Sequence, residues 1–320
     1  RCNFRCVYCM PREVFGPGYA FVPREDLLTL EEIARIARVF AAIGMRKVRI
    51  TGGEPLIRRN LEHLIEMIDA MDEVDDISLT TNGSMLSPGR AVDLRKSGLK
   101  RLTISLDALD DPTFKRINDV DYPVSRVLDG IEHARAAGFS GTKINVVVRR
   151  GFNQHAVLDL VKHFRHTDCI VRFIEYMDVG ETNGWNLDDV IPASDLVDEI
   201  DARYPLEAIS QNYPGEVAKR WRYRDGAGEI GFITSVTQSF CGECSRARLS
   251  AVGQVYTCLF SSQGHDLRDL LRSGASDDQL LQAVCEIWQG RNDRYSELRA
   301  TATSIPASGQ AKVEMSHIGG

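Results

Sequence analysis

Segments with strand character alternate with segments of helical periodicity along the first 180 residues, and this alternation constrains the fold more than any other feature. The β-branched run Lys143–Val148 is typical of a buried strand. Thr29, followed three residues later by Glu32, has the pattern of a helix capping box. Such alternation predicts an α/β fold with parallel strands and helices outside them. The expected strands are Lys47–Ile50, Ile77–Thr81, Leu102–Asp107, Lys143–Val148 and Ile170–Tyr176.

Polar residues gather where these strands end. Thr51–Glu54 follows the first strand, Asn82 follows the second, and Ser105 lies near the end of the third. In α/β barrels the carboxyl ends of the strands carry the active site, so these positions are candidates for binding or catalysis. The cysteine-containing loop at residue 2 is expected to follow a further strand upstream of Arg1.

A polar and turn-rich stretch divides the chain. A length of 320 residues suits about two domains. Residues 1–179 are predicted to form a barrel-like domain, residues 180–193 a linker, and residues 194–320 a smaller α+β domain. Within the latter, residues 291–320 have weak periodicity and are predicted to be an irregular tail.

The charge and hydropathy of the chain argue against two classes of partner. The net charge is -6, whereas nucleic-acid-binding domains are usually strongly basic, so no nucleic-acid partner is expected. No uncharged apolar run approaches ~18 residues, so no membrane partner is expected either. The chain opens at Arg1 without a secretory signal, which predicts a cytoplasmic location. A small anion held in a local basic pocket is compatible with this composition.

Six of the eight cysteines fall into two groups of three. The first group has the spacing C-x3-C-x2-C and the second C-x2-C-x13-C. Without a secretory signal, metal binding is a better interpretation than a disulfide framework. Structural zinc has four closed ligands, whereas an iron–sulfur cluster held by three thiolates leaves one iron open for a ligand. The two triads are Cys2, Cys6 and Cys9, and Cys241, Cys244 and Cys258.

Three further residues bear on this interpretation. His265 lies seven residues beyond Cys258 and would complete a Cys3His zinc site, an alternative for the second triad. Cys169 and Cys285 are single and flanked by apolar residues, so they are expected to be inert core thiols.

The segment Cys2–Cys9 (CNFRCVYC), followed by the TGGEP run at Thr51–Pro55, resembles the radical S-adenosylmethionine (SAM) enzymes. The second half narrows the resemblance through three features: CGECSRARL at Cys241–Leu249, CLF at Cys258–Phe260, and the closing Gly319–Gly320. By these motifs the chain is identified as a member of the GTP 3',8-cyclase family of molybdenum-cofactor biosynthesis. The resemblance extends over essentially the whole chain.

The resemblance implies a fold and a reaction. The fold is an incomplete (β/α)6 TIM-like barrel with a smaller C-terminal domain that carries a second iron–sulfur cluster. The reaction is a radical SAM lyase reaction in which a 5'-deoxyadenosyl radical removes the 3' hydrogen of GTP and C3' then bonds to C8. In the family a basic substrate-binding residue precedes the first cysteine, and that contact is assigned to no residue here.

The resemblance also implies cofactors and their ligands. Two [4Fe–4S] clusters are expected, one on each cysteine triad, and SAM is expected at the first. The second cluster is expected to hold the guanine of GTP through its open iron. Glycines without a Cβ at Gly52 and Gly53 would let the backbone approach a ligand closely. The expected SAM contacts are Tyr8, Gly53, Ser105 and Met177.

Part of the evidence for the substrate contacts comes from the spacing of the residues and not from the resemblance. Arg246 and Arg248 share a face if their segment is extended, and two guanidinium groups on one face suit a triphosphate. Arg172 is a further candidate, with a salt bridge to Glu175 or Asp178 as the alternative. The candidate GTP contacts are Arg49, Thr80, Lys143, Arg172, Arg246 and Arg248.

The closing residues Gly319 and Gly320 are expected to reach into the active site and to be needed for catalysis. The expected partners are GTP, an external electron donor and a downstream cyclic pyranopterin monophosphate synthase, and a homodimer is compatible with the resemblance. Two alternatives stay open: a peptide-modifying radical SAM maturase, and a metal-binding scaffold without catalysis that carries zinc on the second triad and His265.

Overall fold

The alternation of strands and helices is confirmed in the first half of the chain. The structure is a computed structural model that describes residues 1–238, 241–242, 244–301 and 312–319. Five strands occur in the expected order, and each pairs in parallel with the next. They are β1 (Lys47–Ile50), β2 (Asp76–Thr81), β3 (Arg101–Ser105), β4 (Lys143–Val148) and β5 (Ile170–Glu175).

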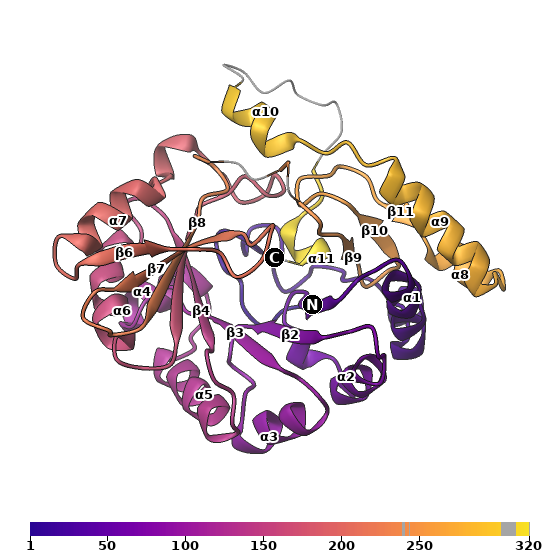
Figure 1. The fold of residues 1–320 in the computed structure, drawn as a ribbon, viewed down its shortest axis with the longest axis horizontal. Coiled ribbons are helices and arrows are strands. Elements are labelled where there is room, and N and C mark those ends of the chain that lie inside the picture. Colours follow the sequence, from indigo (N-terminus) through magenta and orange to yellow (C-terminus); the bar gives the residue numbers. More distant parts are fainter. Residues whose placement is uncertain (239–240, 243, 302–311, 320) are drawn as a thin grey trace.

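Helices cover the outside of this curved sheet, and the start of the chain lies within the curve (Figure 1). The helices are α1 (Leu30–Ala42), α2 (Leu61–Asp69), α3 (Pro88–Lys96), α4 (Asp111–Asn118), α5 (Val124–Ala136) and α6 (Val157–Phe164). Short 3-10 turns lie at Arg24–Asp26, Pro55–Ile57, Gln154–Ala156 and Leu187–Asp189.

Helix starts follow from local capping chemistry. The expected capping box at Thr29 is present: its hydroxyl accepts from the Glu32 amide at 3.1 Å, and the Glu32 carboxylate accepts from the Thr29 amide at 2.7 Å. Asp110 caps α4 by accepting from the Thr113 amide at 2.8 Å, and this helix was not among the expected elements.

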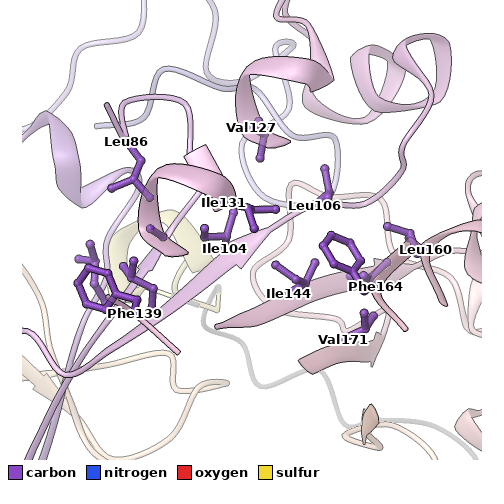
Figure 2. Packing of buried hydrophobic residues seen from close by; sticks show 14 of the residues in the cluster. Leu86, Ile104, Leu106, Val127, Ile131, Phe139, Ile144, Leu160, Phe164 and Val171 are labelled. Carbon is purple, nitrogen blue, oxygen red and sulfur yellow. The ribbon is translucent and has the colours of Figure 1, made fainter. Parts of the chain in front are cut away.

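The core lies between the sheet and the helices (Figure 2). Because strands of a covered parallel sheet are buried on both faces, their residues are almost continuously apolar. Ile104 of β3 and Ile144 of β4 are fully buried, as are Val127 of α5 and Leu160 of α6. Each such side chain stabilises the fold by about 1.5–3 kcal/mol relative to an exposed position.

The sheet continues beyond the predicted linker. Strand β8 (Glu229–Ile233) pairs in parallel with β5, and β7 (Ala218–Tyr223) and β6 (Leu206–Ile209) extend the same sheet in antiparallel fashion. Helix α7 (Ala193–Asp201) connects β5 to this group. Strands before and after residues 180–193 therefore belong to one sheet. The division into two domains at that point stays a prediction.

A smaller unit follows the large sheet. It contains a three-stranded antiparallel sheet of β9 (Arg248–Leu249), β10 (Gln254–Tyr256) and β11 (His265–Asp266), followed by α8 (Arg268–Arg272) and α9 (Asp277–Gln289). A second apolar cluster joins Ile36 and Val39 of α1 to Leu280 and Val284 of α9. This packing fastens the C-terminal unit to the first helix of the barrel (Figure 1).

The prediction of an irregular tail over residues 291–320 is wrong for part of that range. The described residues include α10 (Tyr295–Thr301) and α11 (Met315–Ile318), and α11 lies within the curve of the sheet (Figure 1). Helices this short depend on tertiary contacts, which a sequence pattern does not reveal. No helix among the described residues is long and apolar enough to cross a bilayer.

Candidate active site

The first cysteine triad lies on a loop that the barrel holds in place. The Cys9 and Met10 amides donate to the Cys6 carbonyl at 2.9 and 2.8 Å, which closes the loop into a tight turn. The guanidinium of Arg5 donates to the Cys2 carbonyl at 2.9 Å. Phe4 is buried with its ring 6.2 Å from that of Phe114 of α4. Backbone bonds and an aromatic anchor thus fix where the three thiols lie.

Burial governs the protonation of these thiols. It raises the pKa of Cys9 to about 12 and that of Cys6 well above its ordinary value, and the negative charges of neighbouring thiolates raise both further. The charge of Cys2 acts on both Cys6 and Cys9, and the charge of Cys9 acts on Cys6. A cationic iron centre is the kind of partner that favours three such thiolates, so this donor set fits a cluster.

Tyr8 and Asp107 form a buried pair beside the first triad. The Tyr8 hydroxyl donates to Asp107 at 2.8 Å, and the Val147 amide donates to the other carboxylate oxygen at 2.8 Å. Burial raises the pKa of Asp107 to about 6, and the hydrogen bond from Tyr8 partly opposes this shift. Tyr8 was a predicted SAM contact, whereas its bond to Asp107 was not predicted.

The loop after β1 packs against the start of the chain. A Cβ on Gly53 would lie 2.4 Å from the Arg1 carbonyl oxygen, so only glycine fits there. The Glu54 amide donates to that same carbonyl at 2.9 Å, and its carboxylate accepts from Thr81 at 2.7 Å. Gly52, at φ +151, faces open space. Of the two glycines, Gly52 leaves room for a ligand, and Gly53 makes room for the cysteine loop.

Ser105 and Met177 lie at the carboxyl ends of their strands, as predicted. Ser105 closes β3, and Met177 lies two residues beyond β5. Met177 packs against a small apolar cluster that includes Ile174 and Ile233, so a packing role accounts for it as well as ligand contact does. The SAM contacts of both residues stay predictions.

Cations from distant parts of the chain lie close enough to act on one another and on the second triad. The charges of Arg101 and Arg246 both act on Arg49, although these residues are far apart in sequence. Burial lowers the pKa of Lys143 to about 8, and the charges of Arg172, Arg101 and Arg49 lower it further. Arg101 is paired with Asp76, whereas desolvation lowers the pKa of both Arg49 and Lys143 and the charge of Arg49 acts on Lys143, a setting that suits a polyanion.

Arg172 has a specific place in this cation cluster, which comprises Arg49, Arg101, Lys143, Arg172, Arg246 and Arg248. Its Nε donates to Asn145 at 3.0 Å, and its buried Nη2 has no partner. Gly231 of β8 lies opposite, and a Cβ there would come within 3.2 Å of the Arg172 Cγ. Glycine at 231 therefore makes room for this side chain, a signal that the sequence alone did not reveal.

The alternative salt bridges for Arg172 do not form in the described part of the chain. Glu175 instead accepts from the amides of Ala193, Val236 and Thr237 at 2.9 Å each. Asp178 pairs with Arg299 and Lys312. With those carboxylates occupied, Arg172 remains available for an anionic ligand.

Thr80 carries a second unsatisfied group. Its Oγ1 is buried and has no hydrogen-bond partner. Buried polar groups almost always have one, so an orphaned hydroxyl beside the cation cluster indicates a position where a ligand would bind. Among Arg49, Lys143, Arg172 and Arg248, no ion pair with a carboxylate forms within the residues that the structure describes.

The second cysteine triad lies among arginines. The Arg246 guanidinium donates to the Cys244 Sγ at 3.0 Å. Burial alone would raise the pKa of Cys244, but hydrogen bonding and the charges of Arg246 and Arg291 outweigh it, so the pKa falls below its ordinary value. Cys258 and Arg248 act on each other electrostatically, which places the triad beside the cation cluster. The Cys244 thiolate is favoured in this way, which suits a ligand of an iron–sulfur cluster, whereas burial raises the pKa of Cys258.

The zinc alternative has no geometric support. The described residues contain no group of three or more His, Cys, Asp or Glu side chains arranged around one metal ion. His265 is exposed on β11 and pairs with Val255 through the backbone. A four-iron cluster is larger than a single ion, so its thiolate ligands need not converge on one point.

The two remaining cysteines are less buried than expected. Cys169 and Cys285 are both half-buried rather than core residues. Burial still raises the pKa of Cys169 to about 11, which keeps it protonated and unreactive near neutral pH.

The C-terminal tail reaches the first site. Ile318 and Gly319 are buried, and a Cβ on Gly319 would lie 2.5 Å from the Thr51 Cγ2. Gly319 also has a φ of +73, a conformation that favours glycine. Gly320 lies outside the described residues. The tail thus passes next to Gly52 at the carboxyl end of β1.

Comparisons with known proteins agree with this site. Residues 1–164 match the Radical SAM superfamily and residues 169–297 match Molybdenum Cofactor Synthesis C. A protein of Acidothermus cellulolyticus named GTP 3',8-cyclase is 50% identical over 341 residues, which cover 100% of this chain and 94% of that protein. The protein of that name from Xanthomonas axonopodis pv. citri is 48% identical over 319 residues, covering 100% and 93%.

The solved structures show a similar fold at low identity. Streptococcus suis SuiB bound to S-adenosylmethionine has a TM-score of 0.62 and 15% identity, covering 95% of this chain and 67% of that one. The partial barrel predicted from the motifs is therefore confirmed as a radical SAM fold. From the identity over the full chain and the two matched regions, this chain belongs to the GTP 3',8-cyclase family of the radical SAM enzymes.

Proposed function

We propose that the protein is a radical SAM lyase that converts GTP to (8S)-3',8-cyclo-7,8-dihydroguanosine 5'-triphosphate, the first step of molybdenum cofactor biosynthesis. The observation that carries this proposal is the cation cluster beside the second cysteine triad. Strands β1, β4, β5 and β9 each contribute one of its side chains: Arg49, Lys143, Arg172 and Arg248. A nucleoside triphosphate is the substrate whose charge such a cluster would neutralise.

The chain's own residues would bind and orient GTP. The guanidinium groups of Arg172 and Arg248 would contact phosphate oxygens, because planar donor pairs match that geometry. Bound phosphate would raise the pKa of Lys143 again and so stabilise its charged form, because the anion offsets the desolvation that lowers this pKa. The orphaned Thr80 hydroxyl would gain a hydrogen-bond partner from the same ligand.

The cysteine triads would hold two [4Fe–4S] clusters. The first cluster, with SAM, would supply the one-electron chemistry that starts the reaction. Cys2, Cys6 and Cys9 would hold it, with Tyr8, Gly53, Ser105 and Met177 as the proposed SAM contacts. Cys241, Cys244 and Cys258 would hold the second cluster, next to the guanine of GTP.

The tail would exclude water from the reacting atoms. Gly319 lies against Thr51, and the buried Ile318 precedes it. Filling this space would protect a reactive site from solvent, which a closed active site requires. Gly319 and Gly320 are therefore the residues we propose to be needed for catalysis.

Two partners follow from the chemistry. Reductive chemistry requires an external electron donor, and the cyclised product requires a downstream enzyme, for which cyclic pyranopterin monophosphate synthase is the candidate. A peptide-modifying maturase is less well supported, because the cation cluster suits a triphosphate. The similarity to SuiB, at 15% identity, concerns the fold and gives no support to a particular substrate.

The test is anaerobic turnover of the cluster-loaded protein with GTP, SAM and a reductant. The cyclised nucleotide is measured by chromatography and mass spectrometry, with ATP as the control substrate. We expect product from GTP and none from ATP. SAM cleavage that is equally fast with and without GTP, with no nucleotide product, would contradict the proposed function.

A further inference from the structure

Two side chains of the C-terminal tail bind the barrel before the tail reaches Gly319, and the Val313 amide between them donates to the Ser261 carbonyl at 3.1 Å. The two side chains are those of Lys312 and Glu314, and both bind the loop that follows β5, between Asp178 and Thr182. The inference drawn from them rests on the proposed catalytic role of the tail. It concerns what fixes the tail in position, which neither the motifs nor the relatives indicate.

The Glu314 carboxylate sits in a cradle formed by three consecutive residues. One oxygen accepts from the amides of Glu181 and Thr182 at 2.9 and 3.3 Å, and the other accepts from the Thr182 hydroxyl at 2.8 Å. Gly180 completes the cradle: a Cβ there would lie 2.2 Å from the carboxylate, and its φ is +73. Hydrogen bonds to a charged acceptor are stronger than neutral ones, and here one carboxylate receives three.

The position of Glu314 in α11 links this cradle to Gly319. Glu314 is the N-cap residue of α11, but its side chain makes no capping bond and reaches across to the cradle instead. The helix it begins is a single turn, and the Gly319 amide closes that turn by donating to the Met315 carbonyl at 2.8 Å. A fixed Glu314 therefore fixes Gly319 at the other end of one rigid turn.

The second contact is more redundant. The Lys312 ammonium donates to the Asp178 carboxylate at 2.9 Å and to the Tyr295 hydroxyl at 2.6 Å. Asp178 is buried and also accepts from Tyr295 and Arg299 of α10. If Lys312 were removed, Asp178 would keep these two partners. Lys312 thus directs the tail toward the loop, and Glu314 sets its final position.

We propose that Glu314 is a positioning residue: its carboxylate, bound by the backbone of residues 181–182 and the Thr182 hydroxyl, holds Gly319 against Thr51 and so places the tail in the active site. The cradle begins at Gly180, three residues after Met177, the proposed SAM contact. Docking of the tail and the shape of the SAM site are therefore coupled through one short loop.

The experiment measures docking and turnover separately in cluster-loaded protein. Hydrogen–deuterium exchange of residues 315–319 reports docking without any catalysis. Losing a charged hydrogen-bonded group costs about ten- to a hundredfold in the docking equilibrium, so Glu314→Ala should speed exchange there by a similar factor. Exchange in β3, within the core, should not change.

Kinetics provide the second measurement. In Glu314→Ala we expect kcat for GTP cyclisation to fall about ten- to a hundredfold with KM for GTP unchanged, because the cation cluster is untouched. Thr182→Val, which replaces the hydroxyl with a methyl group and keeps the backbone amide, should show a smaller loss, and Thr182→Ser should retain activity. Combining Glu314→Ala with Thr182→Val should add little, because both act through one contact.

Glu132→Ala is the matched control, since Glu132 is an exposed glutamate paired with Arg135 on α5. It should leave both measurements unchanged. Unaltered exchange at 315–319 in Glu314→Ala would overturn the positioning role. Faster exchange with unaltered kcat would show that Glu314 holds the tail but would overturn the proposed need for the tail in catalysis, which distinguishes the two failures.

Discussion

The two cysteine triads differ in the charges that surround them. Burial and neighbouring thiolates raise the pKa of Cys6 and Cys9, and a carboxylate, Asp107, lies nearby. Around the second triad, by contrast, Arg246 and Arg291 lower the pKa of Cys244. Burial raises the pKa of Cys258 as well, and Arg248 opposes that shift. The triads therefore differ in the arginines beside the second and the carboxylate beside the first, and not in burial.

This difference indicates which ligand belongs to which triad. SAM carries a positive sulfonium, so the enclosed site near Asp107 suits it. GTP carries a triphosphate, so the site among arginines suits it. The charges around the two triads support the proposed assignment of SAM to the first and GTP to the second, and the predictions below test that assignment.

Removing a ligand of each cluster should have the largest effects and should separate the sites. Cys6→Ala should reduce iron from about eight to about four atoms per chain and abolish SAM cleavage. Cys258→Ala should lose the same amount of iron but keep some SAM cleavage. Iron and sulfide assays on anaerobic protein measure both.

Cys169→Ala and Cys285→Ala serve as controls for those variants. Both should keep full iron content and SAM cleavage, because each residue is a half-buried single thiol away from the triads. Loss of a cluster in either control would mean that the ligand sets are assigned wrongly.

Deleting Gly319 and Gly320 should abolish cyclisation while both clusters and GTP binding persist. The tail contacts Thr51, which is not one of the proposed GTP contacts, so we expect the deletion to leave those contacts in place. Gly320→Ala should be severely impaired as well. Turnover within about twofold of the parent, equivalent to under ~0.5 kcal/mol in the barrier, would show that the tail has no catalytic role.

Arg246→Ala or Arg248→Ala should weaken GTP binding about ten- to a hundredfold, since each removes a charge-assisted contact worth about 1.5–3 kcal/mol. Both clusters should still assemble. Isothermal titration with GTP and with SAM gives the two dissociation constants. An unchanged constant for GTP, or an equal loss for SAM, would break the assignment of ligands to sites.

The smallest expected effect is a pH dependence of GTP binding. Burial and the surrounding arginines lower the pKa of Lys143 to about 8, so the free protein loses this proton as pH rises through that value. GTP affinity should then fall by about threefold to tenfold between pH 7 and 9, while SAM affinity stays level. In Lys143→Arg, whose charge persists, the slope should flatten. An equal slope in both proteins would remove Lys143 from the substrate site.

The sequence predicted those parts of the fold that follow from local patterns. Strands Lys47–Ile50 and Lys143–Val148 match β1 and β4 at both ends, and the capping box at Thr29 is present. The parallel pairing of β8 with β5 was not predicted, because strand pairing between distant segments leaves no local signal. The helical segments within residues 291–319 were missed for a similar reason: tertiary contacts stabilise them.

For the site, motifs indicated which residues carry chemistry but not how they are supported. The family resemblance and the strand positions predicted three of the basic residues as GTP contacts. In the structure the charge of Arg49 acts on both of the others, Lys143 and Arg248. The Tyr8–Asp107 bond, the space that Gly231 leaves for Arg172, and the Glu314 cradle join segments up to 133 residues apart. Such contacts depend on the folded geometry, so no spacing rule reveals them.

The most direct test of the assignment is electron paramagnetic resonance of the anaerobically reduced protein, titrated separately with GTP and with SAM. Cys258→Ala and Cys6→Ala proteins identify the signal of each cluster. We predict that GTP changes only the signal of the cluster on Cys241, Cys244 and Cys258, and that SAM changes only the signal of the cluster on Cys2, Cys6 and Cys9. A shift of the first cluster's signal by GTP in Cys258→Ala protein would contradict the division between the two sites.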